Sequence, residues 1–162
     1  MATSADLTVW RITTRRFAAS AFTGEGARLY GGRWNRVGLP LVYTAQSRSL
    51  ALLEMLVQDE PLRARYVLIP AVIGKAVGRT SVLISGLPTN WCSAQHRDTL
   101  QALGQKWLAS GKSCVLAVPS AVVPSELNYL INPRHPDFGK IKIGKPAPLE
   151  TDSRLMRAFQ QE

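Results

Sequence analysis

The chain has few of the residues that build metal centres and disulfide frameworks. It contains two cysteines and two histidines among its 162 residues, and Cys92 and Cys114 are far apart and not grouped with His96 or His135. A structural zinc site needs four such ligands close together, and disulfide scaffolds carry more cysteines. We therefore expect no metal site, and two free, buried thiols in a reducing compartment.

Long apolar runs are also missing. None approaches the roughly 18 residues that a membrane-spanning helix needs, and residues 1–17 lack the apolar block of a secretory signal. Apolar residues make up 46% of the chain and the mean hydropathy is -0.02, as in ordinary globular proteins. The length suits one domain over residues 1–162, long enough to bury its own core. We expect a cytoplasmic protein without membrane contact.

Acidic residues are scarce, at 11 against 20 Lys and Arg, which leaves a formal net charge of +9. Such a charge favours an anionic partner: nucleic acid, an acidic protein or a phosphorylated small molecule. The basic residues are scattered, and Lys140, Lys142 and Lys145 come nearest to a patch. No helix-turn-helix or RNA-binding signature accompanies them. A basic binding module therefore stays open beside an enzyme that steers an anion into a cleft.

Hydrophobic patterning predicts strands and helices in mixed order. Strands are expected at Leu7–Ile12, Leu39–Ala45, Arg65–Ile73, Ser113–Val118 and 141–143. Helices are expected from Ser47 or Ser49 to about Gln58, over Asp98–Ser110 with Gly111 as its end, and over Asp152–Gln161. This pattern predicts a single α+β domain built on one central mixed sheet.

The most informative segment is glycine-rich and spans residues 24–35 (Gly-Glu-Gly-Ala-Arg-Leu-Tyr-Gly-Gly-Arg-Trp-Asn). Glycine allows the backbone to approach a ligand closely, and the guanidinium groups of Arg28 and Arg33 match a phosphate or carboxylate. Neither the Walker A pattern nor the GxGxxG fingerprint is present. The segment indicates the floor of a site for an anionic, nucleotide-like ligand, with a solvated surface loop as the alternative.

Glu54 is the only charge in the apolar stretch 50–57, which is expected to form a buried helix. Burying an ionised carboxylate there costs free energy unless the group is paired or faces a ligand cleft. A carboxylate in such a place often acts as a general acid or base with a shifted pKa, or stabilises a cation. The sequence does not identify the basic group that faces Glu54, and Arg33 is the natural candidate. The alternative is that Glu54 lies on the solvent-exposed face of a half-exposed helix. Tyr43, at a strand end, is able to stack on a planar ring or to serve as core.

Ser120 follows an apolar strand, at a place where functional side chains are common. A Ser/His/Asp hydrolase could be drawn from Ser120, His135 and Asp137, but the serine lacks a GxSxG elbow and prolines crowd the other two. We discount that hydrolase. His135 and Asn132 are instead expected to satisfy backbone groups in a proline-rich loop.

Together these clusters resemble the RES domain family, which is named for an arginine, a glutamate and a serine. The resemblance is carried by Gly-Gly-Arg-Trp-Asn at 31–35, Val-Tyr-Thr-Ala at 42–45, Leu-Leu-Glu at 52–54, Val-Pro-Ser at 118–120 and Asn-Pro-Arg-His-Pro-Asp-Phe at 132–138. It extends from Trp10 to Leu155 and shows no departure at the three naming positions. The family supplies the toxins of bacterial RES-Xre toxin-antitoxin systems.

The resemblance implies a fold similar to ADP-ribosyltransferase toxins, with NAD+ as substrate and no metal. It implies Arg33, Glu54 and Ser120 as catalytic residues, Tyr43 as a residue grouped with them, and Arg28 as a weaker candidate. We expect Arg33, with Arg28, to hold the pyrophosphate and Tyr43 to stack on the nicotinamide or its ribose. Ser120 is expected to bond the ribose or amide, and Glu54 to stabilise an oxocarbenium-like cation.

The resemblance also implies a cognate Xre-family antitoxin, a homodimer, and DNA contact only through the antitoxin. The expected activity is NAD+ cleavage at the nicotinamide–ribose bond. Water, phosphate and a protein remain open as acceptors, so an ADP-ribosyltransferase that modifies a cellular protein is the alternative within the enzyme class. The basic binding module is the alternative outside it.

Overall fold

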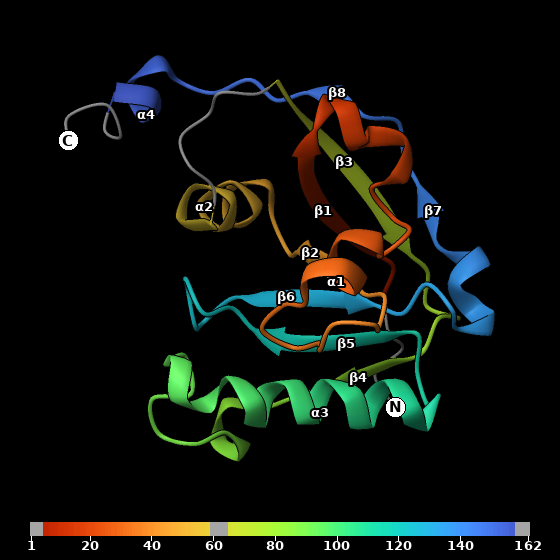
Figure 1. The fold of residues 1–162 in the computed structure, drawn as a ribbon. Coiled ribbons are helices and arrows are strands. Elements are labelled where there is room, and N and C mark those ends of the chain that lie inside the picture. The colour runs from red at the N-terminus through yellow and green to blue at the C-terminus, as the bar shows by residue number, and fades with distance from the viewer. Residues whose placement is uncertain (1–4, 59–64, 158–162) are drawn as a thin grey trace.

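The computed structural model describes residues 5–58 and 65–157, in which eight strands form one mixed sheet (Figure 1). The strands are β1 (Leu7–Thr14), β2 (Val42–Ala45), β3 (Tyr66–Ile73), β4 (Arg79–Ser81), β5 (Val115–Pro119), β6 (Leu127–Ile131), β7 (Lys142–Ile143) and β8 (Ala147–Pro148). Their order is β4-β5-β6-β2-β1-β3-β7, with β8 also paired to β3. Only the β4–β5 pair is parallel among these pairings. The predicted α+β class with a mixed central sheet is confirmed.

Four α-helices and four short 3-10 helices lie within the described ranges. They are η1 (Arg15–Ser20), α1 (Glu25–Tyr30), α2 (Arg48–Gln58), η2 (Ile84–Gly86), η3 (Ala94–His96), α3 (Arg97–Ser110), η4 (Pro136–Lys140) and α4 (Ser153–Arg157). Ser47 caps α2, because its Oγ accepts the Leu50 N–H at 3.1 Å. Gly111 ends α3 in the left-handed region, with φ 60°. Both helices agree with the sequence prediction.

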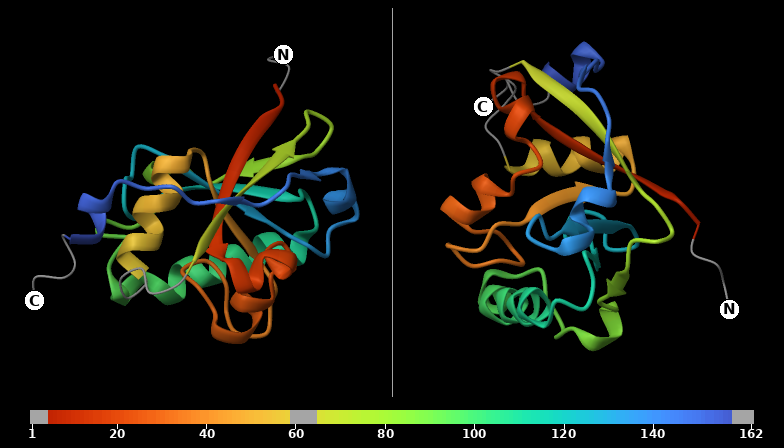
Figure 2. Two further views of the ribbon diagram at one scale, coloured as in Figure 1. Left: turned by 90° about the horizontal axis from the view of Figure 1, so that it is seen from above. Right: turned by 90° about the vertical axis from the view of Figure 1, so that its right-hand side faces the viewer.

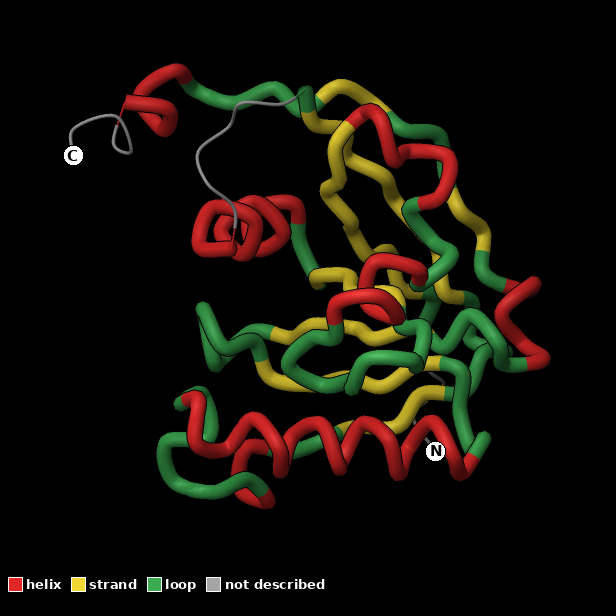
Figure 3. Tube along the Cα trace, viewed as in Figure 1, coloured by secondary structure: helices red, strands yellow, loops and turns green. Residues whose placement is uncertain are grey.

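Several elements differ from the prediction. Helix α1 lies inside the segment interpreted as a glycine-rich loop, although the chain from α1 to β2 is indeed loop (Figure 3). Strand β6, just before the predicted proline-rich loop, was not predicted. The closing helix begins at Ser153, and residues 158–161 of its predicted span lie outside the described residues. The prediction missed α1 because it is short, and β6 because its alternation is interrupted by Asn128.

The sheet divides between β1 and β2. These strands share the single register pair Trp10↔Ala45, whereas β1 pairs with β3 along its whole length. The β1–β3 half therefore turns away from the β2–β6–β5–β4 half, as the views from two further directions show (Figure 2). A gap in strand pairing leaves a place where side chains from both halves converge.

Two main hydrophobic clusters support the sheet. One is centred on β1 and β3 and includes Val9, Ile69 and Ile73, all at most 1% exposed. In the other, Leu100 and Trp107 of α3 pack with Leu116, Val118 and Leu130 of β5 and β6. Cys92 and Cys114 form no disulfide. No described helix is long and apolar enough to cross a membrane.

Candidate active site

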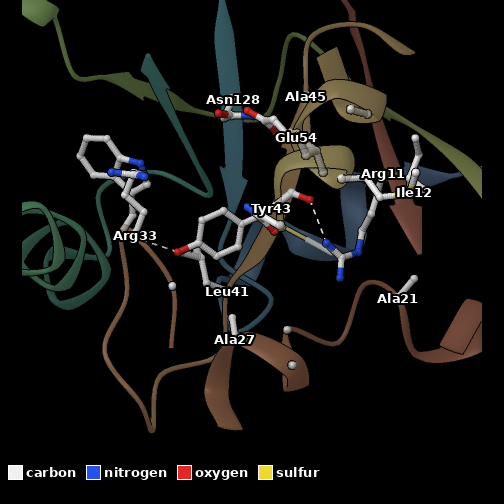
Figure 4. A pocket seen from close by; sticks show the side chains of 18 of the residues that line it. Arg11, Ile12, Ala21, Ala27, Arg33, Leu41, Tyr43, Ala45, Glu54 and Asn128 are labelled. Carbon is white, nitrogen blue, oxygen red and sulfur yellow. Dashed lines mark hydrogen bonds between the residues drawn. The ribbon is translucent and has the colours of Figure 1, made fainter. Parts of the chain in front are cut away.

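A cavity of about 330 Å³ lies where the sheet divides. Its walls come from β1, α1, the loop 31–34, β2, α2 and β6, together with Ala121 and Val122. Figure 4 shows how the labelled side chains gather around it, with Arg33 and Arg11 on either side of Tyr43 and with Asn128 beside Glu54. Three residues singled out from the sequence, Arg33, Tyr43 and Glu54, therefore line one cavity.

Glu54 turns into this cavity from α2. Its Oε1 accepts a hydrogen bond from Ser120 Oγ at 2.8 Å, and its Oε2 accepts one from Asn128 Nδ2 at 2.7 Å. Burial raises the pKa of Glu54, although these two bonds and the charge of Arg33 oppose the shift. The carboxylate is thus held in one orientation beside a ligand-sized space.

The exposed residues of α2 are both polar (Arg48, Ser49 and Gln58) and apolar. Leu53 is 42% exposed and Val57 is 65% exposed, while Glu54 is half-buried. The prediction of a fully buried helix is therefore wrong. The alternative described α2 correctly as half-exposed, but Glu54 is itself half-buried and bonds to Ser120 and Asn128.

Ser120 lies behind Glu54 and is 0% exposed. Its hydroxyl donates its one hydrogen to Glu54, and its oxygen accepts the N–H groups of Val122 at 3.1 Å and Val123 at 3.2 Å. A serine hydroxyl offers one donor and two acceptor sites, so no capacity remains for a ligand. The expected direct bond from Ser120 to a ribose or amide does not fit this arrangement, in which Ser120 orients Glu54.

Asn128 is a site residue that the sequence analysis missed. Its Nδ2 donates to Glu54 Oε2 and also to the Thr44 carbonyl at 3.1 Å, and the residue is 8% exposed. The available signal was a lone amide within the apolar run of 127–131. A buried amide requires hydrogen-bond partners, and here one of them is the carboxylate of Glu54.

Arg33 sits in a turn closed by the Gly32 N–H, which donates to the Asn35 carbonyl at 2.9 Å. Its Nη1 donates to the Cys92 carbonyl at 2.9 Å. Asn35 is 0% exposed, and its side chain donates to the carbonyls of three neighbouring residues: Ala27, Arg36 and Leu39. The backbone that carries Arg33 is therefore held in place without any ligand.

Tyr43 uses its hydroxyl to hold the same turn. The hydroxyl donates to Asn35 Oδ1 at 2.6 Å and accepts the Trp34 N–H at 3.1 Å. Burial raises the pKa of Tyr43, which keeps the phenol neutral. Gly32 is required here, since a Cβ at this position would overlap the Tyr43 hydroxyl. The ring of Tyr43 still lines the cavity, but its polar end faces away from a ligand.

Arg28, the weaker candidate, is engaged elsewhere. Its Nε donates to Glu25 at 2.9 Å, and its Nη2 forms an ion pair with the same carboxylate. Both side chains are exposed, at 38% and 51%. Glu25 lines the cavity, whereas Arg28 is not among the lining residues. In this arrangement Arg28 neutralises the carboxylate of Glu25 at the exposed edge of the cavity.

Arg11 is the second site residue that the sequence analysis missed. It projects from β1 into the cavity, and its Nη1 donates to the Tyr43 carbonyl at 3.0 Å (Figure 4). Its Nε is buried without a hydrogen-bond partner, and no carboxylate in the described ranges forms an ion pair with it. Burial lowers its pKa. An unpaired guanidinium in a cavity is costly, which points to an anionic ligand.

The discounted hydrolase triad does not form. Ser120 bonds to Glu54, while His135 Nδ1 accepts the Asp137 N–H at 3.0 Å and its Nε2 lies 3.1 Å from the Gly111 carbonyl oxygen. Asn132 Oδ1 accepts the Arg134 N–H at 3.0 Å. The expectation that His135 and Asn132 satisfy backbone groups is confirmed.

Besides the exposed Glu25, which is paired with Arg28, the cavity thus combines one oriented carboxylate, Glu54, with two guanidinium groups. A carboxylate in this setting stabilises a developing cation, and guanidinium groups bind phosphate through charge-assisted hydrogen bonds. The arrangement suits a ligand that is anionic in one part and becomes cationic in another.

Comparison with known proteins gives a consistent result. A family model described as the RES domain matches residues 8–152. The chain is 38% identical over 154 residues to a Photorhabdus laumondii protein named Toxin Res, covering 93% of this chain and 97% of that one. It is 39% identical over 155 residues to a Sphingobium protein named Prs ADP-ribosylating toxin, covering 91% and 96%. The M.tuberculosis MbcT-MbcA toxin-antitoxin complex contains a chain of the same fold, with a TM-score of 0.74 at 22% identity over 96% of this chain and 90% of that one.

Proposed function

The chain belongs to the RES domain family, and on that premise we propose that it is the toxin of a toxin-antitoxin system and cleaves the nicotinamide–ribose bond of NAD+. One observation carries the proposal. The cavity holds an oriented carboxylate, Glu54, together with Arg11, a cation that has no anionic partner among the described residues. NAD+ matches both groups. Its anionic pyrophosphate would pair with Arg11, and its nicotinamide ribose, which becomes cationic as the glycosidic bond breaks, would face Glu54.

In the proposed reaction the bond between the ribose C1′ and the nicotinamide nitrogen breaks, and its electron pair stays on the nitrogen. Neutral nicotinamide leaves, and the ribose becomes an oxocarbenium-like cation. Glu54 stabilises that cation and orients a ribose hydroxyl or the attacking water. Water adds at C1′ and loses a proton, so the products are nicotinamide, ADP-ribose and H+. No step requires a metal ion.

The other residues hold the substrate or hold Glu54. Arg33 and Arg11 bind the pyrophosphate by charge-assisted hydrogen bonds, and the Tyr43 ring stacks on the nicotinamide or its ribose. Ser120 acts on the reaction through Glu54, since its hydroxyl is fully engaged. Arg28 has a peripheral role as the partner of Glu25.

The acceptor defines a second candidate function. A protein nucleophile that enters in place of water would receive the ADP-ribose, and the same Glu54 would serve that transfer. The Sphingobium relative named Prs ADP-ribosylating toxin favours this version. Inorganic phosphate is a third acceptor of the same kind. The basic nucleic-acid or acidic-protein binding module stands outside the enzyme class and rests on the net charge of +9.

We also propose an antitoxin partner, because the structural neighbour was solved as a toxin-antitoxin complex. The charge of +9 then suits an acidic antitoxin surface over the cavity. An antitoxin of the Xre family that carries the DNA contact, and a homodimer of this chain, complete the proposed assembly. A cytoplasmic location fits an enzyme that acts on NAD+.

The decisive experiment follows NAD+ loss while nicotinamide and ADP-ribose are quantified, for the purified wild type beside Glu54→Ala with the antitoxin absent. Loss in the wild type alone, with equal nicotinamide and free ADP-ribose, supports the glycohydrolase. Nicotinamide without matching ADP-ribose supports transfer to phosphate or protein, and mass spectrometry of the products separates the two. No loss in either protein, with inorganic phosphate and a cell extract supplied as acceptors, overturns the enzyme proposal. A steep salt dependence of nucleic-acid affinity would then support the binding module.

A further inference from the structure

Helix α3 contacts the turn that carries Arg33. Gln101 Nε2 donates to the Gly32 carbonyl at 2.9 Å and to the Asn35 carbonyl at 3.1 Å. These two carbonyls flank Arg33 on either side in the sequence. One side-chain amide on α3 therefore bridges both ends of the turn.

The helix and the turn are also pressed closely together. A Cβ at Gly104 would overlap the carbonyl oxygen of Trp34, so α3 approaches the turn at a distance that only glycine allows. The Trp34 side chain is 2% exposed and packs in one cluster with Leu100 and Trp107 of α3. The backbone next to Arg33 therefore has little room to move while α3 stays in place.

The Arg33 side chain is aimed by the segment just before α3. Its Nη1 donates to the Cys92 carbonyl, and the neighbouring Trp91 contacts Trp34, with ring centroids 6.3 Å apart. No carboxylate of the described residues forms an ion pair with Arg33. Its direction is therefore set by neutral groups, which leaves its charge available to a ligand.

We propose that Gln101 is a positioning residue for substrate binding, which acts by holding the Gly32–Asn35 turn so that Arg33 faces the cavity. The proposal rests on the proposed function, in which Arg33 binds the pyrophosphate. Gln101 is not among the residues that line the cavity. Without its amide, two carbonyls lose a donor and the turn gains alternative conformations. Arg33 must then be ordered when the substrate binds, which weakens binding.

The test compares Gln101→Met with Gln105→Met. Methionine keeps an unbranched side chain with good helix propensity but has no amide. Gln105 is a matched control, because it lies on the exposed side of the same helix and bonds to Arg36 instead of the turn. We expect Gln101→Met to raise KM for NAD+ about tenfold with kcat within about twofold. Gln105→Met should change neither constant.

Coupling to Arg33 separates positioning from a general structural role. In an Arg33→Ala background, Gln101→Met should cause almost no further loss of kcat/KM, because both changes remove the same interaction. If the fold losses of kcat/KM of the two single variants instead multiplied in the double variant, the proposal would be overturned. Equal KM values for the wild type and Gln101→Met would also overturn it.

Amide hydrogen exchange gives a readout that does not depend on activity. Gln101→Met should speed exchange in the peptide that covers residues 31–35 and leave β5 and β6 protected, whereas Gln105→Met should leave all of them unchanged. Faster exchange throughout the molecule would show a loss of global stability and overturn the positioning role. If the wild type does not consume NAD+, the proposed function fails, and the exchange pattern alone still decides whether Gln101 holds the turn.

Discussion

Glu54 and Arg11 face the same cavity, but the free protein satisfies them to different degrees. Both carboxylate oxygens of Glu54 accept hydrogen bonds from side chains. Arg11 donates from Nη1 to a carbonyl, while its Nε is buried without a partner. The carboxylate is already oriented in the free protein, whereas the guanidinium retains hydrogen-bonding capacity, which under the proposed function serves the pyrophosphate. Under the proposed function, α2 therefore carries the catalytic carboxylate and β1 carries a cation that binds the substrate.

Removing the charge of Glu54 should have the largest effect. Glu54→Gln keeps the shape but cannot stabilise an oxocarbenium-like cation, so we expect kcat for NAD+ cleavage to fall roughly 100- to 1,000-fold. KM should change by less than about threefold, because the pyrophosphate contacts remain. Steady-state kinetics with nicotinamide release measure both constants. A variant that kept most of its turnover would contradict the proposed mechanism.

Removing the charge of Arg11 on β1 should mainly weaken substrate binding. We expect Arg11→Met to lower kcat/KM about 10- to 100-fold, because a charge-assisted hydrogen bond to the pyrophosphate is lost. Its Tm should stay within about 4 °C of the wild type, since loss of the bond to the Tyr43 carbonyl is offset by removal of an unpaired buried cation. Calorimetry alongside kinetics provides the measurement. A large loss of Tm with unchanged KM would make Arg11 a structural residue.

The variant Ser120→Ala tests how much the orientation of the Glu54 carboxylate matters, because it leaves the charge of Glu54 in place. We expect about a tenfold loss of kcat, because Glu54 keeps only the Asn128 bond. The hydrogen bond from Ser120 lowers the pKa of Glu54, so its loss raises that pKa further. Activity that depends on the ionised carboxylate falls as the pH drops through this pKa, and the acidic limb of kcat against pH should move to higher pH. If the acidic limb of the kcat–pH profile did not move, that limb would not reflect the ionisation of Glu54.

Substitutions in the exposed ion pair between Arg28 and Glu25 should have the smallest effect on activity. Arg28→Ala removes the partner of Glu25 and leaves a carboxylate beside the pyrophosphate path. Because both groups are exposed and screened by salt, we expect KM to rise by no more than about threefold. The double variant Glu25→Ala/Arg28→Ala should return KM toward the wild-type value. A loss comparable to that of Arg11→Met would give Arg28 the direct role that the resemblance suggested.

Local pattern predicted much of the fold. The helical spacing of 50–57 and 98–110, and the apolar runs of β1, β3 and β5, are properties of neighbouring residues and were read correctly. Short elements such as α1 and β8 were missed, because a few residues carry too little periodicity. The division between β1 and β2 was not predictable, since strand pairing depends on partners far along the chain.

The sequence by itself determined which residue types were available: an arginine in a glycine-rich turn, a lone carboxylate in an apolar helix and a tyrosine at a strand end. All three line the cavity. Only the tertiary structure decided what supports them. Ser120 meets Glu54 across 66 residues, and Gln101 meets Gly32 across 69. Such contacts depend on strand register and helix packing, which bring together side chains that local sequence cannot relate.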